Sequence, residues 1–350
     1  MPFHERQSMK PKELVIHLTL QCPLRCAHCC VDATMSRSGH LDESAVLAAI
    51  DDAALIDGLE RVSFAGGDPF LHVGIMEAAV RHATARGLRS GAVTSAYWAT
   101  SSEKALAVLR PLVEAGLDRL TLSYDDAHAP FVSAQKIVDA YEAARTLNIE
   151  ILISVAVEPG AKITVEWMRR LLSPLPEARV VFIESVINST GRAAVEATTE
   201  QREGRRRHDG VYRGPCTSVF RQISLHEDGA VTPCCGVIPT RDRLRVGTIE
   251  RDSIRSSTDR ALRDPLFRWI AFEGPVEILK QITRGTATPM NDDDFDGICH
   301  ACDVLFTSEE NLRLLDEALP RKEFSLRVQE TIFTAAGLFR PATMITEGKP

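Results

Sequence analysis

The sequence has 350 residues, of which 44% are hydrophobic and 25% charged, a composition that excludes a disordered chain. Its 41 Lys and Arg against 48 Asp and Glu give a net charge of −7, which argues against nucleic acid as the main partner. No apolar run reaches the roughly 18 residues of a membrane-spanning helix. The N-terminal residues lack the apolar core of a signal peptide, so we expect a cytoplasmic protein.

Apolar segments of strand length alternate with helix-period segments from residue 13 to about residue 188. The predicted strands are 13–20, 61–65, 90–95, 119–124, 150–157 and 179–187. The predicted helices are 42–57, 73–86, one capped by Thr100 and Glu103 and ending near Gly116, 133–147, and one capped by Thr164 and ending near 173–174. This alternation predicts a parallel sheet with right-handed crossovers. Six units fall short of a closed eight-stranded barrel, so an open partial barrel and a doubly wound sheet both fit.

The pattern changes after residue 188. Residues 189–213 are polar and aperiodic, which predicts a linker or mobile loop with a solvated Arg run. A second region follows, in which Asp228-Gly229 predicts a hairpin between two strands, with helices over 253–284 and 308–339. We therefore expect an N-terminal tail (1–12), an α/β domain (13–188), the linker, a small domain (214–305) and a C-terminal helical segment (306–350).

Cysteines cluster directly after the first predicted strand. Cys22, Cys26 and Cys29 stand at a C-x3-C-x2-C spacing, with Cys30 adjacent. In a reducing compartment such cysteines indicate metal binding rather than disulfides. Three thiolates on one loop can hold three corners of a cubane iron–sulfur cluster and leave the fourth iron open. A structural zinc site requires four ligands and therefore fits this loop less well than a cluster does. Inert core cysteines are the other alternative, and they also fit the spacing less well.

These residues resemble the cluster loop of the radical S-adenosylmethionine (radical SAM) superfamily, and further segments follow the family's order. They include His28 near the adenine, the GGE-P-like Gly66, Gly67 and Asp68, Thr94 of a T-N-G-like stretch, Ser123, Asp125 and His128 of an S-x-D…H segment, Ser154, and Arg192 of a G-R-A segment. The resemblance implies a partial (β/α)6 TIM-like barrel. It implies that these residues bind SAM or the cluster surroundings, with Asp125 and His128 as the catalytic candidates. A surface turn rich in Asp is the alternative for the last two.

The remaining cysteines form a second group. Cys216, Cys234, Cys299 and Cys302 follow a C…G-x4-C…C-x2-C layout that resembles the auxiliary-cluster domains called SPASM and twitch. The five cysteines of this region are enough for one four-cysteine cluster but not for two. The count therefore favours the shorter twitch domain. Cys234 fits the spacing from Gly229 better than Cys235 does. A structural zinc held by the same thiolates stays open.

The resemblance implies two 4Fe–4S clusters, SAM as cosubstrate, a flavodoxin- or ferredoxin-like reductant, and hydrogen abstraction by a 5′-deoxyadenosyl radical. An auxiliary cluster favours oxidative outcomes such as cross-linking or dehydrogenation. Epimerisation would need a hydrogen donor, for which Cys30 and Cys235 are candidates if they are not inert.

Three functions fit the sequence: a maturase of a ribosomally made peptide, an oxidase or dehydrogenase of a small metabolite, and a non-catalytic iron–sulfur protein. The 12 residues before the first predicted strand are too few for a fused leader-peptide-binding domain. A peptide would therefore be held by the barrel mouth, the second region or a separate partner protein.

Overall fold

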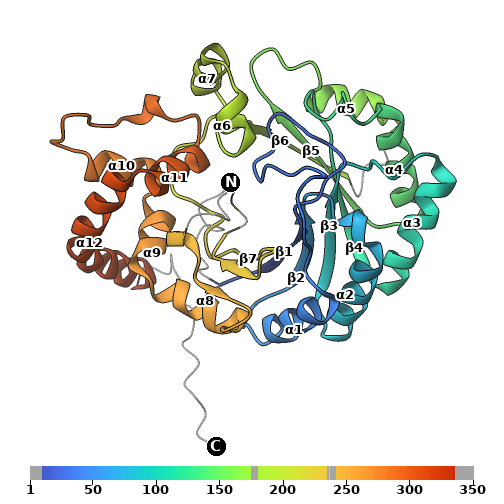
Figure 1. Cartoon of the computed structure of the whole chain (residues 1–350), viewed down its shortest axis with the longest axis horizontal. Coiled ribbons are helices and arrows are strands. Elements are labelled where there is room, and N and C mark those ends of the chain that lie inside the picture. The colour runs from blue at the N-terminus through green and yellow to red at the C-terminus, as the bar shows by residue number, and fades with distance from the viewer. Residues whose placement is uncertain (1–9, 175–179, 235, 237–241, 336–350) are drawn as a thin grey trace, which may run out of the picture.

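The computed structural model describes residues 10–174, 180–234, 236 and 242–335. Six parallel strands follow one another across the sheet in sequence order. They are β1 (Glu13–Thr19), β2 (Arg61–Gly66), β3 (Arg89–Thr94), β4 (Leu117–Ser123), β5 (Glu150–Val157) and β6 (Val180–Val186). The predicted partial barrel is confirmed, and the sheet curves around a central space (Figure 1). The start of the last predicted strand, residue 179, lies outside the described residues.

Helices cover the outer face of this sheet, as Figure 1 shows. They are α1 (Glu43–Ala53), α2 (Val73–Ala85), α3 (Ser102–Ala115), α4 (Ala134–Thr146) and α5 (Val165–Leu171). The strands alternate accordingly: Ile151, Ile153 and Val155 of β5 are buried in the core, while the residues between them are less buried. Burial of these apolar faces is the main stabilising contribution to the layered fold. Thr164 caps α5 as predicted, but Ser101 rather than Thr100 caps α3, because its side chain accepts from the amide of Lys104.

The sheet does not end at β1. Strand β7 (Gln222–Leu225) pairs in parallel with β1, and the antiparallel strands β8 (Ala230–Thr232) and β9 (Gly247–Thr248) follow it. The predicted hairpin at Asp228-Gly229 is confirmed between β7 and β8. The second region therefore shares one nine-stranded sheet, in the order β6-β5-β4-β3-β2-β1-β7-β8-β9, with the barrel.

The predicted linker at 189–213 is wrong in part, since it contains α6 (Arg192–Glu196) and α7 (Thr199–Arg206). Two of its arginines are buried: Arg192 at 3% exposure and Arg205 at 4%, the latter paired with Glu158 at 2.9 Å. A polar, aperiodic sequence can still be ordered when buried hydrogen bonds replace apolar contacts, and such bonds leave no periodicity in the sequence.

The chain continues into helices that complete the ring of Figure 1. They are α8 (Ile254–Arg263), α9 (Pro265–Phe272), α10 (Pro275–Ile282), α11 (Ile298–Thr307) and α12 (Glu309–Ala335). Residues 336–339 of the last predicted helix lie outside the described residues. Trp269 and Phe267 anchor the apolar core of this region. No helix in the described ranges is both long and apolar enough to cross a membrane.

Candidate functional site: two cysteine centres

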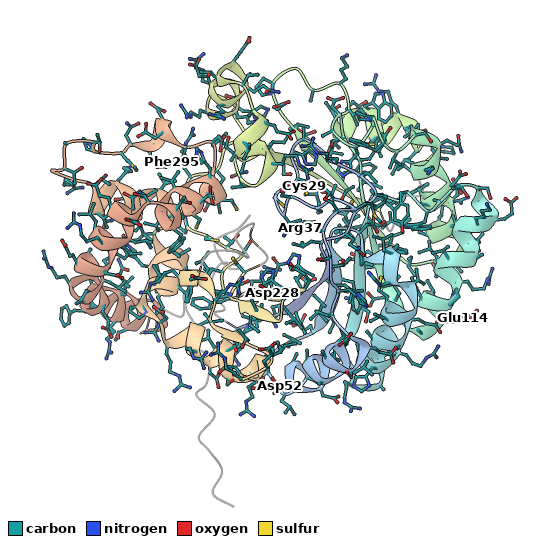
Figure 2. The ribbon with its side chains drawn as sticks, viewed as in Figure 1. Cys29, Arg37, Asp52, Glu114, Asp228 and Phe295 are labelled. Carbon is teal, nitrogen blue, oxygen red and sulfur yellow. The ribbon has the colours of Figure 1, made fainter. Side chains whose placement is uncertain are left out.

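The three spaced cysteines lie on the loop that follows β1, in the interior of the ring, where Figure 2 labels Cys29. Backbone amides point at two of the sulfurs: Leu24 N–H donates to Cys22 Sγ at 3.4 Å, and Ala33 N–H donates to Cys29 Sγ at 3.3 Å. Burial raises the pKa of the Cys22 thiol to about 12 and that of Cys26 further. Neutral thiols are thus favoured until a cation compensates the thiolates, so this donor set fits a cluster.

The glycine pair at the end of β2 packs against the start of the cysteine loop. The amide of Gly67 donates to Thr19 O at 2.6 Å. A Cβ on Gly67 would lie 1.9 Å from Gln21 O, and one on Gly66, at φ +124°, would lie 2.2 Å from Thr19 O. Only glycine permits this approach, so Gly66 and Gly67 position the loop.

Asp68 joins the ends of β2 and β3. Its buried carboxylate accepts from Thr94 Oγ1 at 2.9 Å, from the Ser95 amide at 3.0 Å and from Ser95 Oγ at 2.9 Å. Burial raises its pKa in spite of these donors. The Asp68 and Thr94 side chains therefore bind each other and hold the ends of β2 and β3 together.

His28, Asp125 and His128 meet at the end of β4. Asp125, 2% exposed, lies 2.9 Å from His28 Nε2 and 2.8 Å from His128 Nδ1. Burial would raise the pKa of Asp125, but the hydrogen bonds from His128 and His28 outweigh it and hold that pKa well below the usual range. The carboxylate ties the cysteine loop to β4, and its ligand atoms and those of the two histidines lie within 4.8 Å of one another.

Ser123 and Ser154 are partners across the β4–β5 ladder, so both predicted polar positions lie side by side. Each is half-buried.

Arg192 lies against the cysteine loop rather than at a strand end. Its amide donates to Cys29 O at 2.9 Å, and its guanidinium donates to Cys26 O at 2.7 Å and to Ala33 O at 2.8 Å. The guanidinium also pairs with Asp32 at 2.7 Å. Arg192 is thus a positioning residue for this loop.

Cys216, Cys234, Cys299 and Cys302 converge from three separate segments. Cys302 interacts electrostatically with the other three thiols, and burial raises the pKa of all four. Backbone amides of Ser218 and Val219 point at the Cys216 sulfur. Four half-buried cysteines, of which Cys216 and Cys234 have amide donors at sulfur, fit a four-thiolate metal centre.

Cys30 and Cys235 are the two cysteines outside both predicted ligand sets. Cys30 is exposed and lies close enough to Cys299 to act on it electrostatically. Cys235 lies outside the described residues. The described cysteines are all free thiols.

A pair of histidines inside the sheet was missed by the sequence reasoning. His17 of β1 stacks on His226, next to β7, with ring centroids 4.8 Å apart. His17 is 6% exposed, and neither ring nitrogen has a partner in the described part of the chain. Burial lowers its pKa to about 4. The sequence carries one sign of this pair, because His17 stands within the otherwise largely apolar run 13–20.

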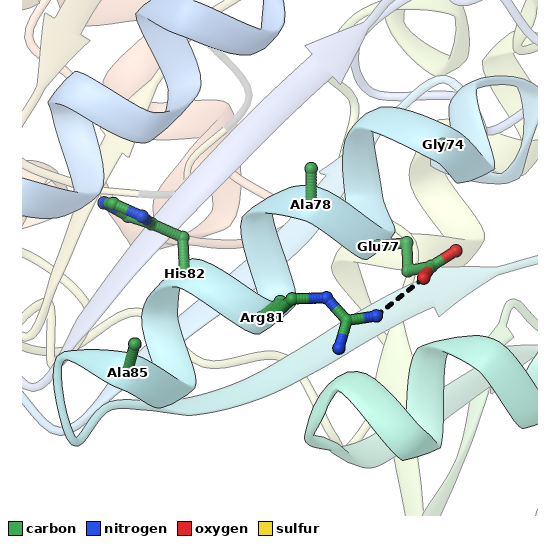
Figure 3. Close-up of a pocket in the computed structure, with 6 residues that line it drawn as sticks. All are labelled: Gly74, Glu77, Ala78, Arg81, His82 and Ala85. Carbon is green, nitrogen blue, oxygen red and sulfur yellow. Dashed lines mark hydrogen bonds and ion pairs between the residues drawn. The ribbon is translucent and has the colours of Figure 1, made fainter.

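One surface hollow lies on α2, well outside the cysteine loop (Figure 3). It is lined by Gly74, Glu77, Ala78, Arg81, His82 and Ala85. Its charged side chains are satisfied within helices: Arg81 pairs with Glu77 at 2.8 Å, and His82 with Asp51 at 2.7 Å. The Arg81 and His82 side chains of this hollow are thus already paired with carboxylates.

Comparisons with known proteins agree with this geometry. Residues 16–166 match the family model described as the Radical SAM superfamily. The chain is 21% identical over 313 residues to YydG, a Bacillus subtilis (strain 168) protein named for peptide biosynthesis, covering 87% of this chain and 95% of YydG.

The chain is also 34% identical over 178 residues to the PqqA peptide cyclase of Methylobacterium nodulans (strain LMG 21967 / CNCM I-2342 / ORS 2060). That match covers 43% of this chain and 45% of the cyclase, so the chain spans less than half of this relative. Among solved structures, the fold resembles native anSMEcpe with bound AdoMet and Kp18Cys peptide, at a TM-score of 0.56 and 14% identity, over 91% of this chain and 99% of that one. The matched segment includes the cysteine loop, the glycine pair, Asp68 and Asp125, so residues 16–166 are similar to the radical SAM superfamily domain.

Proposed function

We propose that this protein oxidatively modifies a ribosomally made peptide, with one 4Fe–4S cluster and SAM at the cysteine loop and an auxiliary cluster at the four-cysteine site. The observation that carries the proposal is the convergence of four half-buried cysteines in a region that shares one continuous sheet with the domain of the three-cysteine loop. The likeness to YydG along nearly its whole length, together with the cyclases named for a peptide, supports a peptide substrate.

Cys22, Cys26 and Cys29 would ligate the first cluster. Bound there with SAM, the cluster supplies the one-electron reduction that cleaves SAM to methionine and a 5′-deoxyadenosyl radical. The chain's own role is to hold the loop in place. Gly66 and Gly67 pack against its start, and Arg192 donates hydrogen bonds to its carbonyl oxygens.

His28 and His128, fixed by Asp125, would face SAM or the substrate, with Ser123 and Ser154 beside them. Their hydrogen-bonding groups would orient the nucleoside or the reacting carbon, and orientation accounts for much of the control over a reactive radical.

The outcome is a net two-electron oxidation. One hydrogen atom leaves the substrate carbon for the 5′-deoxyadenosyl group and gives 5′-deoxyadenosine. One proton and one electron must then leave as the new double bond or cross-link forms. The thiolates of Cys216, Cys234, Cys299 and Cys302 would hold a group able to take that electron.

Free thiols at both centres require reducing surroundings such as the cytoplasm. We expect a flavodoxin- or ferredoxin-like protein as the electron donor, and a separate protein as the carrier of a peptide leader where the peptide has one.

The test is anaerobic reconstitution with iron, sulfide, SAM and dithionite, with synthetic peptides encoded by short reading frames beside the gene. Mass spectrometry should show 5′-deoxyadenosine together with a peptide that has lost two hydrogens. Cys26→Ala should abolish 5′-deoxyadenosine, whereas Cys30→Ala should retain the cluster. Equal 5′-deoxyadenosine from Cys26→Ala would overturn the cluster assignment, and turnover of small alcohols but of no peptide would overturn the substrate class.

A further inference from the structure

Residues 188–192, which follow β6, touch both cysteine centres, and we call this segment the inter-site strap. On one side, Arg192 holds the carbonyls of Cys26, Cys29 and Ala33. Gly191, at φ +53°, lies so close to the loop that a Cβ would come within 2.4 Å of Cys30 O and 2.6 Å of Cys29 O. The strap and the cysteine loop are therefore held together by hydrogen bonds and by close backbone packing.

On its other side, the strap binds the start of α11, which carries Cys299 and Cys302. The Ser189 amide donates to Asp296 Oδ1 at 3.0 Å, and Ser189 Oγ donates to Asp296 Oδ2. Both residues are buried, at 3% and 1% exposure. His300, between the two cysteines of α11, lies with its Nδ1 3.1 Å from Asp296 Oδ1.

A second contact reinforces this join. A Cβ on Gly297 would lie 2.0 Å from Asn188 Oδ1, so the start of α11 packs directly on the Asn188 side chain of the strap. Figure 2 labels Phe295, next to Asp296, in the upper left of the molecule and Cys29 nearer its middle. The four residues from Ser189 to Arg192 thus join the hydrogen bonds to Asp296, beside the four-cysteine centre, to those on the cysteine loop.

We propose that the inter-site strap, through Ser189 and Asp296, fixes the auxiliary centre relative to the SAM-binding loop, and that this fixed placement is what lets the substrate's electron reach the auxiliary site. Ser189 and Asp296 are positioning residues, since neither would touch the reacting atoms. The inference rests on the proposed function, because it takes the four-cysteine site to be the electron acceptor. Contacts that support metal ligands commonly change affinity or activity by about 10- to 100-fold when they are lost.

The experiment compares Ser189→Ala and Asp296→Asn with Ser102→Ala as the matched control. Ser102 donates to Asp139 at 2.9 Å between α3 and α4, a Ser–Asp bond of the same kind outside both centres. All proteins are reconstituted anaerobically and assayed for iron, for 5′-deoxyadenosine and for peptide product.

We expect iron content and 5′-deoxyadenosine to stay within about two-fold of wild type, while product per 5′-deoxyadenosine falls about ten-fold in both strap variants. Ser189→Thr keeps the hydroxyl and should recover most of the ratio. A second readout is independent of turnover: amide hydrogen exchange over residues 22–33 and 296–302 should speed up together in the strap variants and stay unchanged in Ser102→Ala.

An unchanged product ratio with unchanged exchange in both strap variants would overturn the inference. If Ser189→Ala does not fold, Ser189→Thr and Asp296→Asn carry the same comparison. If wild-type protein cleaves no SAM, the proposed function has failed. The exchange data then decide the strap separately: coupled exchange of the two segments supports it, and independent exchange refutes it.

Discussion

The buried guanidinium of Arg192 donates to the carbonyl oxygen of Cys26 at 2.7 Å, although 166 residues separate the two in the chain. Its second terminal nitrogen reaches Ala33 O and Asp32 at the far end of the same loop. One planar, permanently charged group therefore spans the cysteine loop and sets its width, which an ammonium group cannot do with a single donor atom.

Arg192→Lys should loosen the cysteine loop and weaken retention of the first cluster by about 10- to 100-fold, because the forked contacts to two carbonyls are lost. Iron content after gel filtration and the rate of cluster loss to a chelator would measure the effect. Arg25→Lys is the matched control, since exposed Arg25 is in the same loop and pairs with Glu196 at 2.6 Å. Equal chelator sensitivity of the two variants would contradict the positioning role of Arg192.

His128→Ala should lower turnover and leave the iron content unchanged. His128 hydrogen-bonds Asp125, and within the described residues no hydrogen bond joins its side chain to a cysteine, so its loss should remove an orienting group and spare the cysteines. The change should fall mainly on kcat, at a level of about ten-fold, if the pair orients the reacting groups. Wild-type kinetics in this variant would instead mark Asp125 and His128 as a turn of structural value only.

The supports around the cysteine loop show how far the sequence predicts this site. The strand ends that carry Cys22, Gly66, Asp68 and Asp125 follow from the alternation of strands and helices, because parallel strands present their carboxyl ends at one edge. The role of Arg192 could not be predicted in the same way. It arises from a segment with no periodicity, whose order depends on buried hydrogen bonds made only in the folded chain.

The same limit applies to Ser189 and Asp296. Nothing in a polar stretch marks which serine will meet a carboxylate 107 residues away. The hairpin at Asp228-Gly229 was predictable from turn chemistry, but its pairing with β1 was not, since long-range register leaves no local mark.

The stacked pair of His17 and His226 should make the protein less stable in mild acid. Burial lowers the pKa of His17 to about 4 and that of His226 to about 2, against about 6.5 in the unfolded chain. Between those values the unfolded state binds more protons, so stability is present above pH 6.5 and falls as the pH decreases.

At pH 5, 1.5 units below the unfolded value, each histidine should cost about 2 kcal/mol of unfolding free energy relative to pH 7.5. Urea unfolding at both pH values would measure the loss. His17→Phe keeps the stacked ring without a titrating group, so about half of the pH dependence should disappear. His208→Gln, at a partly exposed loop position where the ring accepts only from the Gly210 amide among the described residues, should keep the wild-type dependence. A wild-type slope in His17→Phe would show that His17 is protonated freely in the folded protein.

The four-cysteine centre gives the sharpest test of an oxidative role. Its four cysteines span 87 residues from Cys216 to Cys302 and lie on α11 and on the loops around β7 and β8, so a metal bound by all four would add stability as well as chemistry. Cys299→Ala/Cys302→Ala should lose about half of the iron of a preparation that holds about eight irons per chain. The variant should still form 5′-deoxyadenosine, because Cys22, Cys26 and Cys29 are untouched, but it should release the peptide without the two-hydrogen loss. A wild-type preparation that saturates at four irons and one zinc would assign the centre as structural. So would a folded double variant that makes product at the wild-type rate, because no electron acceptor would then be needed at that position.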